Sequence, residues 1–201
     1  KCLNTLLNSP GNFTASKFAW VKEFEPESYG QTEKIMLPGD YIAYRLTGDI
    51  TTTPSALSEG MLWDFKSNSV ANSVIDYFGF APSVIPQIKD VFTAHGQVTA
   101  AISEELGLQV GIPVTYKAGD QPNNALSLNV MKPGEVASTA GTSGVIYGVT
   151  DVLLYDRQSR LNSFAHVNYE LDKRRVGVLL CINGAGIFNR WMKNRAGVSY
   201  T

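Results

Sequence analysis

The chain has 201 residues, of which 44% are hydrophobic and 17% are charged, so it can bury a core of ordinary size as one large domain or two modest ones. Its formal net charge of −1 provides no basic surface, which argues against nucleic acid or acidic lipid as a partner. Because it contains no apolar run of about eighteen residues and no secretory signal pattern, we expect a cytoplasmic protein that does not enter a membrane.

The first half of the chain is expected to be rich in helices. Residues 15–24 carry apolar side chains at near-helical spacing and stop before Pro26, which cannot continue a helix. Residues 38–47 have Pro38 at their start and Gly48 just after their last apolar residue. These are the start and stop signals of a short helix.

Helical periodicity returns in residues 69–80 and again in residues 97–108. Asp40 lies close to the start of the helix predicted at residues 38–47, and we expect its side chain to cap that helix. Trp63 is expected to pack inside the protein.

Near residue 112 the pattern changes to one that favours strands. Residues 112–119 read as a strand, and residues 122–131 read as a helix. Residues 135–149 predict two strands joined by a turn of small residues, and residues 174–184 predict a nearly continuous apolar strand. We therefore place a domain boundary close to Gly111.

Two glycine-containing turns in this second half could approach a phosphate group. The first, AGTSG, has glycines at positions 141 and 144 around Thr142 and Ser143, so its backbone N–H groups are not shielded by a Cβ atom. A plain hairpin connection has the same composition. The second, NGAGIFNRW, joins a buried strand to a helix through Gly184 and Gly186, although close helix–strand packing would also explain both glycines. It matches neither a dinucleotide-binding fingerprint nor a P-loop.

Asp120 follows the strand predicted at residues 112–119, where open α/β sheets place their ligands. A carboxylate there could accept the proton of an attacking hydroxyl group during phosphoryl transfer. An aspartate just before Pro122 is also a good helix N-cap, so both interpretations remain open. Gln121 could donate to a ligand or face solvent.

Other kinds of site find less support. His95 and His166 lie far apart, with no cysteine or acid at ligand spacing, so we expect no metal site built on them. Cys2 and Cys181 form no Cys-x-x-Cys pair, which disfavours zinc binding and a disulfide framework. Ser143 lacks the Gly-x-Ser-x-Gly spacing of a serine hydrolase.

Four blocks of sequence, taken in order, resemble the sugar kinases of the FGGY family and, within that family, the xylulokinases most closely. The blocks are TASKFAWVKEFEPE (14–27), KIMLPGDYIAYRLTG (34–48), AGDQ (118–121) and VASTAGTSGVIYGV (136–149). The resemblance implies an α/β protein with the ribonuclease H-like fold of actin-type ATPases, in which helices flank mixed sheets. Residues 1–111 would be the latter part of the N-terminal domain, and residues 112–201 the beginning of the C-terminal, nucleotide-binding domain, so the two-domain kinase is represented only in part.

The same resemblance implies roles for individual residues. Asp120 would be the catalytic base, and both Asp120 and Gln121 would contact the substrate. The nucleotide-binding residues would be Gly141, Thr142, Ser143 and Gly186. Thr14, Lys17 and Trp20 belong to the first block, but Trp20 could equally be core and Lys17 a charge on a helix surface, so we do not assign them to the site.

The reaction implied by the resemblance is the ATP-dependent phosphorylation of D-xylulose to D-xylulose 5-phosphate, with Mg²⁺ as a further cofactor. Kinases acting on ribulose, gluconate, fuculose, rhamnulose or glycerol are the alternatives within enzymes. A non-catalytic actin-type module that binds nucleotide is the alternative outside them. The resemblance also suggests a homodimer. We expect the 201 residues by themselves to be inactive, because much of the phosphate-binding cleft of such a kinase would lie elsewhere.

Overall fold

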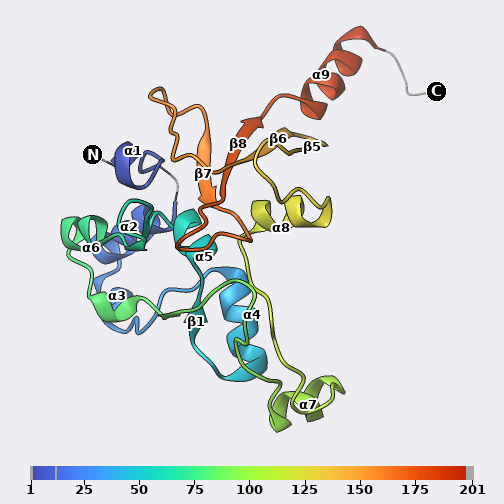
Figure 1. The fold of residues 1–201 in the computed structure, drawn as a ribbon. Coiled ribbons are helices and arrows are strands. Elements are labelled where there is room, and N and C mark those ends of the chain that lie inside the picture. The colour runs from blue at the N-terminus through green and yellow to red at the C-terminus, as the bar shows by residue number, and fades with distance from the viewer. Residues whose placement is uncertain (1, 12, 198–201) are drawn as a thin grey trace.

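The computed structural model describes residues 2–11 and 13–197, which form helices and a four-stranded sheet (Figure 1). The buried apolar side chains form two hydrophobic cores, and Phe13 packs against both. Within the described residues, every helix is too short or too polar to cross a membrane. The last helix, α9, projects away from the other elements in Figure 1.

The elements before Gly111 are mostly short helices. In chain order they are α1 (Cys2–Thr5), α2 (Thr14–Phe24), α3 (Pro26–Gly30), α4 (Pro38–Thr47), β1 (Thr51–Thr52), α5 (Pro54–Glu59), β2 (Trp63–Asp64), β3 (Ser69–Val70), α6 (Asn72–Phe78), the 3-10 helix η1 (Pro82–Val84), β4 (Gln87–Ile88) and α7 (Ala100–Leu106). The strands form two small pairs, β1 with β4 in parallel and β2 with β3 in antiparallel orientation.

The elements after Gly111 include the main sheet. They are α8 (Asp120–Ser127), β5 (Val136–Ala140), β6 (Gly144–Thr150), β7 (Asn162–Ala165), β8 (Val176–Ile182) and α9 (Gly186–Ala196). The strand order is β5-β6-β8-β7, and every neighbouring pair is antiparallel. Because β6 and β8 are antiparallel neighbours, the turn before β6 and the turn after β8 lie at the same end of the sheet.

Most predicted helices and strands are confirmed, because their ends carry clear local signals. The helix predicted at residues 38–47 is α4, with Pro38 in its first turn and Gly48 in the left-handed conformation (φ 79°) at its C-terminal end. The helix at residues 15–24 is α2, which likewise ends just before Pro26. Trp63 is buried, as expected.

The strand predicted at residues 112–119 is wrong, because only the start of this segment pairs with another part of the chain and no continuous ladder forms among the described residues. The segment makes one isolated antiparallel bridge, between Pro113 and Gln97. Backbone hydrogen bonds join Val114 to His95 and Gly96 at 2.8 and 2.9 Å, and Val98 bonds to Ile112 and Gly111, both at 2.9 Å. Beyond Val114, the one further backbone bond between these described segments runs from Lys117 N to Val91 O, at 3.4 Å. An apolar, β-branched pattern therefore produced an extended segment without a continuous ladder.

The strand β7 was not predicted from the sequence, because its four residues have no clear alternation of apolar and polar side chains. It pairs with β8 on one edge, and its other edge is held by the first half of the chain. The Asn8 side chain accepts a hydrogen bond from Ser163 N and donates one to Ser163 O, both at 2.7 Å. The Ser58 hydroxyl of α5 accepts a hydrogen bond from Ala165 N at 2.8 Å. Side chains alternate across the strand, so Phe164 packs in the core of the sheet and Ala165 in the core of the helices.

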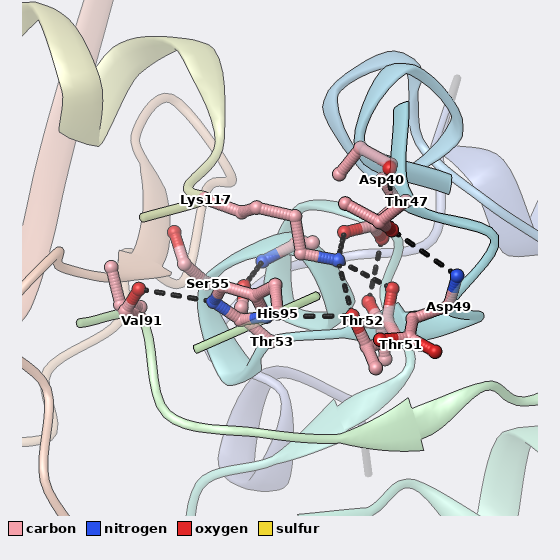
Figure 2. A network of polar contacts seen from close by, with 12 residues as sticks. Asp40, Thr47, Asp49, Thr51, Thr52, Thr53, Ser55, Val91, His95 and Lys117 are labelled. Carbon is pink, nitrogen blue, oxygen red and sulfur yellow. Dashed lines mark hydrogen bonds and ion pairs between the residues drawn. The ribbon is translucent and has the colours of Figure 1, made fainter. Parts of the chain in front are cut away.

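Asp40 does not cap α4, which corrects the expectation from sequence. The N-cap residue is Leu37, and the Asp40 side chain is buried inside the protein (Figure 2). Its Oδ1 atom lies 2.9 Å from Lys117 Nζ, and its Oδ2 atom accepts a hydrogen bond of 2.7 Å from the Thr52 hydroxyl. Asp40 therefore belongs to a buried polar network.

Lys117 is the centre of that network. Its ammonium group donates to Thr51 O at 2.6 Å and to Thr51 Oγ1 at 2.9 Å, in addition to its contact with Asp40 (Figure 2). Burial lowers the pKa of Lys117, while the hydrogen bond and charge of Asp40 act in the opposite direction. The network joins α4, β1 and the segment that leads into α8.

Removing the buried cation should destabilise the fold strongly. We expect Lys117→Met to lower the free energy of unfolding of the complete protein by about 3–5 kcal/mol, because it leaves the Asp40 carboxylate buried without its partner. Urea denaturation measures this change. Combining Lys117→Met with Asp40→Leu should recover part of the loss, since no charge then remains buried.

The matched control is Arg160→Ala, which breaks the exposed ion pair between Arg160 and Asp156. We expect this variant to unfold at nearly the wild-type urea concentration. If Lys117→Met is no more harmful than Arg160→Ala, the network does not stabilise the fold.

Candidate active site

A cavity of about 420 Å³ lies where helices of the first half meet the main sheet. Its walls come from the start of α2, the ends of α4, α5 and α8 that face the sheet, and strands β6, β7 and β8. The lining residues are Phe13, Thr14, Lys17, Leu37, Glu59, Asp120, Gln121, Val145, Phe164, Leu179 and Cys181. Asp120 and Gln121, both assigned from the sequence, therefore lie in one cavity with residues from distant parts of the chain.

Asp120 is the first residue of α8, and its side chain is exposed. The N-cap position belongs to Gly119, and no side chain within the helix caps it, so the capping interpretation of Asp120 is wrong. Within the described residues, its carboxylate has a single hydrogen-bond partner, Gln121 Nε2, at 3.4 Å from Oδ2. A negative charge is favoured at a helix N-terminus. The Asp120 carboxylate is therefore free to accept a proton or a hydrogen bond from a ligand in the cavity.

Glu59 is a second acid of this cavity, and sequence reasoning missed it. It is the last residue of α5, and its side chain reaches the start of α8, where a Cβ atom at Gly119 would overlap its carboxyl group. Burial, and after it the charge of Asp120, raise the pKa of Glu59 to about 8, although the backbone N–H groups of Asp120 and Gln121 act to lower it. A glutamate at the end of a short helix normally faces solvent, so the sequence carried no signal.

The two glycine-containing turns lie against each other. Gly186 N donates a hydrogen bond to Gly141 O at 3.0 Å, and Ile187 N donates to Thr142 O at 3.2 Å. A Cβ atom at position 186 would overlap the Gly141 carbonyl oxygen, so this contact requires glycine at position 186. Gly141, Thr142 and Gly186, predicted separately from two turns, are therefore brought together.

The paired turns lie beside the cavity. The residue pairs Val145–Cys181 and Gly144–Ile182 form the last rungs between β6 and β8, and Val145 and Cys181 line the cavity. The hydroxyl groups of Thr142 and Ser143 make no hydrogen bond to the described residues. They could donate to an anion, whereas the first N–H groups of α9 are already engaged with the neighbouring turn.

The first sequence block contributes more to the cavity than expected. Thr14 and Lys17 both line it, and Lys17 is the one cationic side chain among its lining residues. Lys17 is exposed, as a surface charge would be, but it faces the same space as Asp120. Trp20 is 52% exposed and packs against Phe24 with ring centroids 5.3 Å apart, so it is not a core residue. The sequence feature that could have assigned Lys17 to the cavity was its place in the first of the four blocks that resemble the family.

His166 has a structural role. Its Nδ1 atom accepts a hydrogen bond of 3.0 Å from the Tyr147 hydroxyl, and its Nε2 atom donates to Val130 O at 2.9 Å. Burial lowers the pKa of His166 to about 4, so the ring is neutral at physiological pH. Across residues 2–11 and 13–197, no three His, Cys, Asp or Glu side chains gather in a way that could hold a metal ion.

Comparison with known proteins gives a consistent result. The sequence profile of the N-terminal domain of the FGGY family of carbohydrate kinases matches residues 4–127. The xylulose kinase of Staphylococcus xylosus is 29% identical over 196 residues, a match that covers 95% of this chain and 40% of that protein.

Solved structures agree. The xylulose kinase of Rhodospirillum rubrum superimposes with a TM-score of 0.87 at 25% identity and covers 98% of this chain and 40% of its own. The Plasmodium falciparum glycerol kinase with ADP gives a TM-score of 0.86 at 20% identity, again over 98% of this chain and 40% of its own. The expected ribonuclease H-like, actin-type fold is confirmed. The chain spans about 40% of the length of these proteins.

The contact between the two turns can be tested by adding one methyl group. We expect Gly186→Ala to lower the melting temperature and to speed amide exchange at Ile187, because the new Cβ atom would push the turn away from Gly141 and break the hydrogen bonds that join them. Hydrogen exchange and thermal melting measure these effects.

Gly184→Ala is the matched control, since nothing lies within 4 Å of a Cβ atom at that position. It should leave both quantities close to wild type. Equal behaviour of the two variants would contradict the close approach at Gly186.

Proposed function

The chain belongs to the FGGY family of carbohydrate kinases, and we propose that the complete protein transfers the γ-phosphoryl group of ATP to a hydroxyl group of a sugar. The observation that supports this most directly is the exposed Asp120 carboxylate, which lies in the cavity between α2, α8 and the sheet. We further propose residues 1–111 as the N-terminal domain part and residues 112–201 as the start of the nucleotide-binding domain; this division remains a prediction.

Asp120 acts as the general base in this proposal. Its carboxylate accepts the proton of the attacking sugar hydroxyl as the new O–P bond forms and the bond between the γ-phosphorus and its bridging oxygen breaks. Because its one hydrogen bond to a described residue is long, at 3.4 Å to Gln121, little must be broken before it can accept that proton. Gln121, whose amide lies beside Asp120, would orient the sugar by hydrogen bonding.

The paired turns fit a nucleotide phosphate. The Thr142 and Ser143 hydroxyls have no partner among the described residues, and the close approach at Gly141 and Gly186 holds the turn in place. ATP bound there supplies the phosphoryl group. Mg²⁺, if bound with the nucleotide, would neutralise the negative charge that develops on the phosphates during transfer.

D-xylulose is the proposed substrate, and D-xylulose 5-phosphate the product. Support comes from the relatives: the Staphylococcus xylosus protein and the Rhodospirillum rubrum structure are both xylulose kinases. The cavity offers groups suited to a polyhydroxylated ligand, since Thr14, Lys17 and Gln121 can donate hydrogen bonds and Asp120 can accept them.

The role of Asp120 can be tested in the complete protein. We expect Asp120→Asn to lower kcat by about 10²-fold or more, because the amide cannot accept the proton, while the Kd for ADP stays within about twofold. A coupled assay for ADP and calorimetric titration measure the two quantities. Asp172→Asn, in the loop before β8, is the control and should retain full turnover; wild-type kcat in Asp120→Asn would refute the assignment.

The identity of the sugar can be tested with a substrate panel. We expect the highest kcat/KM with D-xylulose when ADP release is compared with that for ribulose, gluconate, fuculose, rhamnulose and glycerol. A higher value with any of the other five would keep the kinase proposal and reject the substrate. No ADP release above background with all six would favour a non-catalytic nucleotide-binding module.

A further inference from the structure

The wall of the cavity holds a carboxyl group that the proposed reaction does not use. Glu59 ends α5 and lies against Gly119, directly before Asp120 in the chain. Its Oε1 atom is buried and makes no hydrogen bond to any described residue. An ionised oxygen in that position would be costly to bury, which favours the protonated, neutral form of the side chain.

The first turn of α8 depends on α5 for its position. Its N-cap residue, Gly119, has no side chain to satisfy the free N–H groups at the helix start. The Ser55 hydroxyl accepts a hydrogen bond of 3.2 Å from Gly119 N, and Glu59 lies beside the N–H groups of Asp120 and Gln121. Two side chains of one helix therefore fix the point where the Asp120 carboxylate enters the cavity.

The charged and titratable groups around Glu59 come from α8, α2, β8 and β6. Asp120 of α8 is its nearest acid, Lys17 of α2 and Cys181 of β8 line the same space, and Tyr147 of β6 is close enough for Glu59 to contribute to a raised Tyr147 pKa. Lys17, the cation of this set, is an exposed residue. Burial and Asp120 therefore control the protonation of Glu59.

We infer that Glu59 is a positioning residue for Asp120: it holds the first turn of α8 in place and, as a neutral acid, keeps a second negative charge away from the phosphoryl group that arrives there. This inference rests on the proposed kinase function. The requirement for glycine at position 119 follows from it, because any Cβ atom there would displace the Glu59 carboxyl group.

The inference has a pH signature. Since the pKa of Glu59 is raised from 4.5 to about 8, the group carries its proton at neutral pH and loses it as the pH passes through about 8. The second anion then repels the phosphates of the nucleotide. We expect the kcat/KM for ATP of the wild-type protein to fall above that pH.

Variants of the complete protein separate positioning from charge. Glu59→Gln keeps the shape and is always neutral, so it should retain kcat at pH 7 within about twofold and lose the fall in kcat/KM above pH 8. Glu59→Ala and Gly119→Ala should each lower kcat by about tenfold or more, because Asp120 is no longer held in place. Glu104→Gln and Gly30→Ala, at exposed positions with free space, are the controls and should behave as wild type.

Wild-type kcat in Glu59→Ala, or the same fall above pH 8 in wild type and Glu59→Gln, would overturn the inference while Asp120→Asn still tests the kinase. A second measurement is independent of activity. With ¹³C-labelled carboxyl groups, the Asp120 signal should shift as Glu59 titrates near pH 8, and Glu59→Gln should remove that shift. If the protein shows this shift but has no kinase activity, the proposed function is wrong and the coupling of the two acids stands. If the shift is absent, the coupling of the two acids is wrong.

Discussion

A buried ammonium group determines where the candidate site lies. Lys117 Nζ is shared by Asp40 of α4 and by Thr51 of β1, and Asp120 follows it by only three residues. The segment between them is not held in a sheet, so side-chain contacts must do what a ladder of backbone bonds would otherwise do. The start of α8 has little freedom, because the Lys117–Asp40 ion pair holds the segment before it and Ser55 and Glu59 of α5 contact Gly119.

Local signals explain which elements the sequence predicts correctly. Proline at the start and glycine at the end mark α4, and an apolar run of suitable length marks β8, because these features act within a few residues. The false strand at residues 112–119 and the missed strand β7 share one cause. A strand exists only with a partner: β7 pairs with β8 on one edge, and its other edge is held by Asn8 and Ser58, more than one hundred residues away along the chain.

The same division applies to the site. Asp120 and Gln121 were assigned to the site through the family resemblance of the AGDQ block, because the local pattern alone left Asp120 as either a cap or a base; the structure places both residues in the cavity. Glu59 could not be found from the sequence, because its raised pKa and its contact with Gly119 arise only when α5 meets α8 in three dimensions. Lys17 had a partial signal, since its sequence block carried the family resemblance, but the local pattern was equally that of an exposed helix.

The contact between the turns at Gly141 and Gly186 bears on how such a sequence can change over time. The carbonyl groups of one turn accept hydrogen bonds from the first residues of α9, and the missing Cβ atom at position 186 makes room for them. Neither turn can alter its backbone path without disturbing the other. Substitutions in the two turns should therefore covary among related sequences, although more than forty positions separate the turns in the chain.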